Sequence, residues 1–134
     1  MLTASELRNF TGTEQYHRFS ALFPRVIASD GGIHVARHGG QGGAFWLLEA
    51  IASYQPELQR HPDERLKDMQ FWKLVVNADK SAVLTCVPDV GEEPAARQVI
   101  EYTDFDLPEI DLWVAPTDDG KGGLLWVLHL PSEH

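Results

Sequence analysis

The stretch Ala44–Tyr54, AFWLLEAIASY, decides the fold, and it follows the glycine-rich run Gly39–Gly43. Its apolar residues recur at helical spacing and form one stripe, made by Ala44, Leu47, Leu48, Ile51 and Tyr54. Phe45 and Trp46 widen that stripe. A helix that is apolar over so much of its circumference cannot bury this surface against one neighbouring helix and must pack against something larger. We expect the strand-like segments of the second half to be this cover.

The second half contains five strand-like segments, which are Phe71–Val76, Ser81–Val87, Gln98–Phe105, Ile110–Ala115 and Leu124–Leu130. The turn 77–80 joins the first two as an antiparallel hairpin. The last segment is apolar on both faces, which favours a central place in the sheet. We therefore predict one α+β domain over residues 1–134, with N-terminal helices packed on a four- to five-stranded antiparallel meander sheet. Its helical half would span about residues 1–68 and its sheet half about 69–131.

The N-terminal third predicts short elements. Thr3-Ala4-Ser5-Glu6 has the pattern of a capping box, which starts a helix that runs to about residue 10. A second helical turn is expected through Tyr16, Phe19 and Leu22, and Arg25–Ser29 fits a short strand.

Residues 33–38 fit two structures. They form a hairpin if they pair with Val26 and Ile27 across Asp-Gly-Gly, or a helix if they lead into the central one. We favour the helix because Ile33, Ala36 and Arg37 continue toward more helix.

The charge is unevenly spread. Ten acids and one base lie between Val87 and Asp119, and this segment alone accounts for the net charge of −9 of the 134 residues. Such a balance disfavours direct binding to nucleic-acid phosphates. It indicates instead either a solvated edge that keeps the protein soluble or a face that binds a basic partner.

No targeting signal or membrane-length apolar run is visible, which favours a cytoplasmic protein without a membrane partner. The single cysteine, Cys86, lies in an apolar strand and is expected to be a buried, inert thiol.

Four stretches carry a resemblance: LTASELRNFTGTEQYHR at residues 2–18, WLLEAIASYQ at 46–55, YTDFDLPEIDLWV at 102–114, and the terminal LPSEH. In these the chain resembles an uncharacterised family of small bacterial proteins, a domain of unknown function whose members occur on plasmids, prophages and similar mobile elements. The resemblance implies a genetic context and no catalytic residues.

His34 and His38 are the candidate metal ligands. Their i, i+4 spacing puts both imidazoles on one face of a helix, as two zinc ligands require. The residues between them lack the glutamate of an HExxH motif. A third ligand would come from Asp30, His17 or Glu14 through the fold. The alternative is two solvent-facing histidines, and we assign no metal and no cofactor.

The glycine run and the nucleophiles give no catalytic motif. After Gly43 the chain has Ala-Phe-Trp, where a Walker A loop needs Lys and Ser or Thr, so the glycines fit a bend or a close-packing point better than a phosphate loop. No GxSxG elbow occurs, and His129 is a lone strand histidine. The sequence thus favours a non-enzymatic role.

The acidic segment supplies the candidate partner-binding residues, which are Glu101, Asp104, Asp106, Glu109, Asp111 and Trp113. An aromatic anchor among acidic rim residues is typical of protein interfaces. We therefore expect a non-catalytic module that binds a protein with a basic surface, such as a modulator of a nucleic-acid-handling protein. The alternatives are a small metal-dependent enzyme using His34 and His38, and a structural homodimer.

Overall fold

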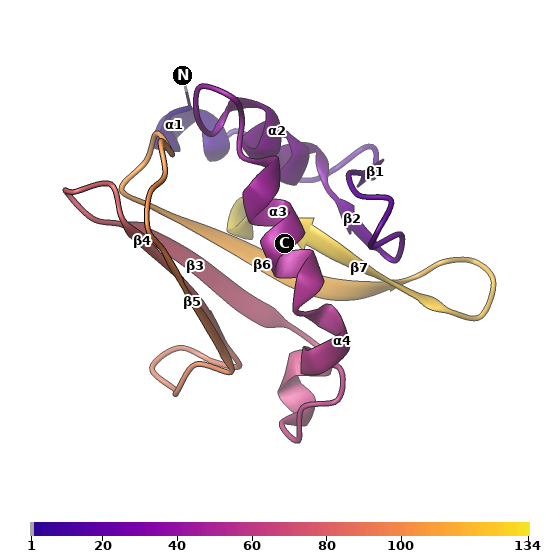
Figure 1. The fold of residues 1–134 in the computed structure, drawn as a ribbon. Helices are drawn as coiled ribbons and strands as arrows, with labels where there is room; N and C mark the ends of the chain where they lie inside the picture. Colours follow the sequence, from indigo (N-terminus) through magenta and orange to yellow (C-terminus); the bar gives the residue numbers. More distant parts are fainter. Residues whose placement is uncertain (1) are drawn as a thin grey trace.

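The computed structural model describes residues 2–134, in which helices lie over one face of a seven-stranded sheet (Figure 1). The helical elements are α1 (Ala4–Leu7), α2 (Asp30–His38), α3 (Phe45–Ser53), α4 (Gln55–Leu58) and the 3₁₀ turns η1 (Glu64–Lys67) and η2 (Pro131–Glu133). The strands are β1 (His17–Arg18), β2 (Val26–Ala28), β3 (Gln70–Val76), β4 (Ala82–Val87), β5 (Ala96–Ile100), β6 (Glu109–Asp118) and β7 (Leu124–His129). Their spatial order is β1-β2-β7-β6-β3-β4-β5.

The α+β class is confirmed, but the expected antiparallel meander of four to five strands is wrong. β2 comes from the first half and pairs in parallel with β7, with Ile27 opposite Val127. β6 pairs with β3 and not with its predecessor β5. A three-residue strand that is buried throughout shows no alternation, so neither its pairing nor its register was readable from the sequence.

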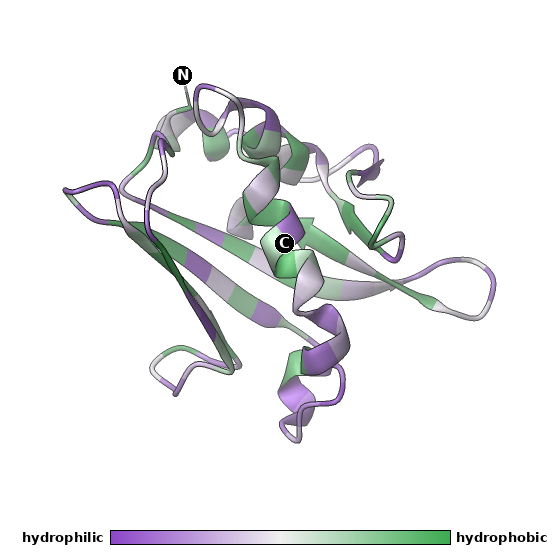
Figure 2. Ribbon diagram, in the orientation of Figure 1, coloured by the Kyte–Doolittle hydropathy of each residue, from purple (hydrophilic) through white to green (hydrophobic). Residues whose placement is uncertain are grey.

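The central helix α3 has one buried side. Leu47, Leu48, Ile51 and Ala52 of α3 are fully buried. They belong to the same buried cluster as alternate residues of the sheet, among them Trp72 and Leu74 of β3 and Leu112 and Val114 of β6. Figure 2 shows this alternation as hydrophobic and hydrophilic bands along β3 and β6. We call the face under the helices the covered face and the opposite one the open face.

Residues 30–38 are helical, so the helical alternative is confirmed and the hairpin is wrong. The Ser29 side chain caps α2 by accepting a hydrogen bond from the Gly32 amide at 3.0 Å. The C-terminal Glu133 reinforces this start: its carboxylate accepts hydrogen bonds from Ser29 Oγ at 2.6 Å and from the Gly31 amide at 3.0 Å. A carboxylate is favourable at a helix N-terminus because the first amides lack partners in the helix.

Several predicted bounds need correction. The capping box of Thr3 and Glu6 is present, but its helix ends at Leu7. The expected helical turn over residues 16–22 is wrong, since the short strand β1 lies there. The third strand of the second half occupies residues 96–100, so 101–108 is a connection. The β3–β4 hairpin is confirmed, as is the interior position of β7. Within residues 2–134 no helix has the length and apolarity that a membrane crossing needs.

Gly43 is required by the turn between α2 and α3. Its φ of +83° lies in the left-handed region, and a Cβ there would approach the Ala36 carbonyl oxygen to 2.6 Å. The same carbonyl accepts a hydrogen bond from the Ala44 amide at 2.6 Å. The glycine run is therefore a bend and a close-packing point.

The variant Gly43→Ala should lower the free energy of unfolding by about 1–3 kcal/mol, because it adds both backbone strain and a steric clash. Gly42→Ala is the matched control, since a Cβ at Gly42 meets nothing within 4 Å. Urea denaturation of both variants measures the difference. Equal stability of the two variants would contradict this account of the turn.

Candidate functional site

The predicted partner-binding residues fall into two separate groups. Glu109, Asp111 and Trp113 belong to β6 and point to its open face, because they alternate with the buried Ile110, Leu112 and Val114. Glu101, Asp104 and Asp106 belong to the connection 101–108, which leaves β5 and returns to the sheet at β6. The sequence analysis placed Glu101 and Asp104 in a strand over residues 98–105, but both lie in the connection, and the crossover from β5 to β6 separates the two groups.

The connection 101–108 packs against the helical layer and is hydrogen-bonded to it. Phe105 is buried and lies against Gly39, where a Cβ would come within 2.7 Å of its ring. Asp104 accepts a hydrogen bond from the Gln41 amide, and Asp106 accepts one from the Leu2 amide, both at 2.9 Å. These contacts fix the backbone of the connection beside the end of β5.

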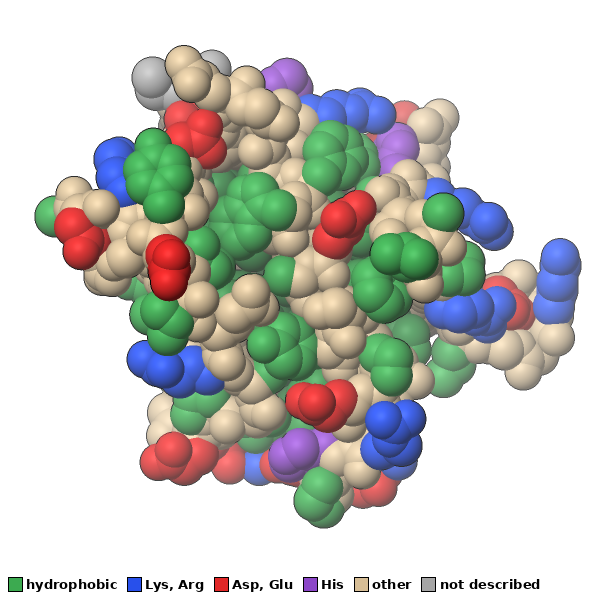
Figure 3. Space-filling view, viewed as in Figure 1, with side chains coloured by type: hydrophobic (Ala, Val, Ile, Leu, Met, Phe, Trp, Pro, Cys, Tyr) green, Lys and Arg blue, Asp and Glu red, His purple; other side chains and the backbone are tan. Residues whose placement is uncertain are grey.

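The three acids of this connection keep their charge uncompensated. Glu101, Asp104 and Asp106 take part in no ion pair within the described part of the chain. Beside them Val99 is 59% exposed and Tyr102 is 70% exposed. We call β5 together with residues 101–104 the acidic edge. On the left of Figure 3 acidic and hydrophobic side chains lie side by side over this part of the molecule.

The acidic edge contains an edge strand of the sheet. β5 pairs with β4 only, so its outer N–H and C=O groups face away from the sheet. A hollow of about 510 Å³ adjoins it and is lined by residues that include Trp46, Ile100 and Tyr102. The arrangement offers backbone hydrogen bonds, apolar contact and negative charge at one place.

The acids of the open face, Glu109 and Asp111, share one positive partner. The Lys73 ammonium lies 3.4 Å from Glu109 and 3.5 Å from Asp111, and these charges, Asp111 foremost, raise the pKa of Lys73. Trp113 packs edge-on against Phe71, with ring centroids 5.1 Å apart. These three predicted residues therefore lie on a surface where one ammonium group partly offsets two carboxylates.

His34 and His38 lie on one face of α2, with ring centroids 4.6 Å apart. His34 Nε2 lies 2.9 Å from Glu6 Oε2, and this hydrogen bond lowers the pKa of Glu6. Two of the proposed third ligands, His17 and Asp30, pair with each other at 2.9 Å. In the described chain no group of three or more histidine, cysteine or acidic side chains has the arrangement of a metal site.

Sequence reasoning missed Tyr102 and Val99, whose exposure no local pattern revealed.

The sequence analysis also assigned no role to His129. His129 is 7% exposed; its Nδ1 lies 3.3 Å from the Val127 carbonyl, and its Nε2 has no hydrogen-bond partner in residues 2–134. Its ring stacks on His134 with centroids 5.6 Å apart. Cys86 is buried as expected, and burial raises the pKa of its thiol to about 12.

The fold and its surfaces define a class of protein: an α+β domain with one helical layer on a mixed sheet and an acidic, unpaired strand edge. A family model described as a family of unknown function (DUF6876) matches residues 1–134, so the chain belongs to that family. No curated protein and no solved structure matches the chain. The resemblance to an uncharacterised family is confirmed to this extent.

His129 makes stability depend on pH. Burial lowers the pKa of His129 below the ordinary value of 6.5. The hydrogen bond to the Val127 carbonyl and the charge of Glu133 act in the opposite direction, and His134 adds a smaller lowering contribution. The unfolded chain then binds this proton more readily than the folded protein does. The free energy of unfolding should therefore fall as the pH drops below about 7 and through 6.5. The decrease ends once the pH is below the pKa of His129 in the folded protein.

Urea denaturation at about pH 7.5 and 5.5 measures this effect in wild type, in His129→Phe and in the exposed control His38→Gln. His129→Phe should lose part of the pH dependence that the wild type and the control retain. Parallel pH profiles for all three proteins would show that His129 does not titrate as described.

Proposed function

We propose that this protein is a non-catalytic binding module that holds a basic segment of a partner protein against its acidic edge. One observation carries the proposal: β5 has a free outer side and is followed by Glu101 and Asp104, which form no ion pair in residues 2–134. A free strand edge recruits an extended segment through backbone hydrogen bonds, and side-chain contacts select which segment binds.

The chemistry of the edge defines the partner. Glu101 and Asp104 attract lysine and arginine side chains, and complementary charge speeds encounter and disfavours acidic competitors. Tyr102 and Val99 supply exposed apolar area, and tyrosine is among the residues that most often dominate binding energy. An extended segment in which basic and apolar residues alternate satisfies both features.

The biological context follows from the nature of such a partner. Proteins that handle nucleic acids present basic surfaces, and we propose that the module modulates or inhibits one of them. Carriage on a bacterial mobile element, which the family resemblance implies, would suit such a modulator. We also propose a cytoplasmic location, with which the single, buried thiol of Cys86 is compatible.

The test captures partners from bacterial lysate at low and high salt and identifies them by mass spectrometry. The edge variant combines Glu101→Gln, Tyr102→Ser and Asp104→Asn, and it should reduce capture of a basic protein by at least about tenfold. High salt should weaken capture by the wild type, because exposed charges are screened.

Two matched controls locate the interface. Glu109→Gln with Asp111→Asn neutralises the acids of the open face, and Glu49→Gln with Glu57→Gln removes the same charge from the exposed surface of α3 and α4. Both controls should capture the partner as the wild type does. Loss of capture only in the open-face variant would move the interface to Glu109, Asp111 and Trp113. A dimer that persists in high salt and captures nothing else would favour the structural homodimer.

A further inference from the structure

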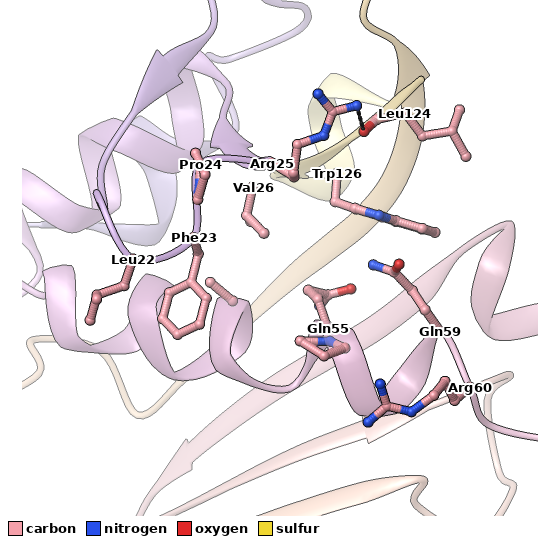
Figure 4. Close-up of a pocket in the computed structure, with 12 residues that line it drawn as sticks. Leu22, Phe23, Pro24, Arg25, Val26, Gln55, Gln59, Arg60, Leu124 and Trp126 are labelled. Atoms are coloured by element: carbon pink, nitrogen blue, oxygen red, sulfur yellow. Dashed lines mark hydrogen bonds between the residues drawn. The ribbon is translucent and has the colours of Figure 1, made fainter. Parts of the chain in front are cut away.

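A large cavity lies near the β2–β7 end of the sheet, away from the acidic edge, between the segment 22–26, the α3–α4 corner and the start of β7 (Figure 4). Its volume of about 760 Å³ is in the range of small-molecule sites. Figure 4 shows Phe23 and Trp126 on opposite sides of this space, with Gln55 between them and Gln59 next to Trp126. Nothing in the proposed partner binding uses this pocket.

The pocket has apolar walls and an apolar mouth. Phe23 and Trp126 supply aromatic walls, and Leu22 and Leu124 also line the cavity although they are 83% and 52% exposed. Exposed leucines at the border of a cavity lose water contact when a ligand enters, which favours binding.

The base of the pocket is held in place by a buried polar pair. Gln55 and Gln70 exchange side-chain hydrogen bonds of 2.9 and 2.8 Å, and Trp72 Nε1 donates to Gln70 Oε1 at 2.9 Å. Both glutamines are at most 2% exposed. A lining residue that is already hydrogen-bonded in this way loses little freedom on binding, so this part of the pocket is preformed.

The charges of the lining are all positive. Arg25 and Arg60 line the cavity, and no acidic residue does, although the protein has a net charge of −9. Arg25 is engaged, since it donates to Asp119 at 2.8 Å and to the Leu124 carbonyl at 2.6 Å. Arg60 belongs to no ion pair among residues 2–134. In Figure 3 basic side chains gather on the right, around the β6–β7 hairpin.

We infer that this pocket binds a small organic carboxylate with a flat apolar body, which lies between Phe23 and Trp126 and pairs its carboxylate with Arg60. The guanidinium group of arginine matches the geometry of a carboxylate. The Gln59 amide, which also lines the cavity, offers a further hydrogen-bond donor.

Binding is tested with 1-naphthylacetate and its neutral isostere 1-naphthylacetamide as probes. Two-dimensional NMR follows the Trp126 indole N–H, assigned with a Trp126→Phe variant, and calorimetry gives the affinities. We expect saturable shifts of that signal, with the amide bound about tenfold more weakly than the acid.

The variants separate charge from apolar contact. Arg60→Gln should weaken binding of the acid about tenfold and leave binding of the amide unchanged. Leu22→Ser should weaken both probes, and Arg8→Gln, at an exposed position outside the pocket, should change neither. Absence of saturable binding of the acid would overturn the inference. Equal affinities for acid and amide, or no effect of Arg60→Gln, would overturn the role of Arg60 and with it the assigned ligand class.

Discussion

The packing of α3 against the sheet is the interaction on which the rest of the structure depends. Its buried side chains share one hydrophobic cluster with those of β3 and β6, and the helical layer to which it belongs lies on one face of seven strands. A sheet of this width has a second face and two edges that one layer cannot cover. The surfaces that remain, the open face and the acidic edge, follow directly from that arrangement.

The two edge strands of the sheet differ in length and in the charge next to them. β1 has only two residues, and such a short edge offers few backbone groups for pairing. β5 is longer, and the connection that follows it places Glu101 and Asp104 just beyond the end of this strand. Charge at an edge hinders pairing with an unspecific apolar strand. The same acids admit a basic segment, so protection against aggregation and selection of a partner have one physical origin.

The sequence predicted those elements whose pattern is local. The apolar stripe of α3, the β3–β4 hairpin and the two-sided apolar β7 each show their structure within a few residues. It did not predict the parallel pairing of β2 with β7, since the partners lie about a hundred positions apart and β2 has no polar face. It also grouped six partner-binding residues that the β5–β6 crossover divides. Only the strand order shows which acids meet Lys73 and which stay unpaired.

The net charge of the chain does not predict the charge of its individual surfaces, because the strand order decides which charged residues lie together. The acidic edge belongs to β5, whereas the pocket with Arg60 adjoins β7, four strand positions away. At about 4.8 Å per strand, this separation is roughly 20 Å. The Debye length at physiological salt is only about 8 Å, so exposed charges at the edge are largely screened at the pocket. A chain with an overall charge of −9 can therefore hold a basic segment at one side of its sheet and an organic anion at the other.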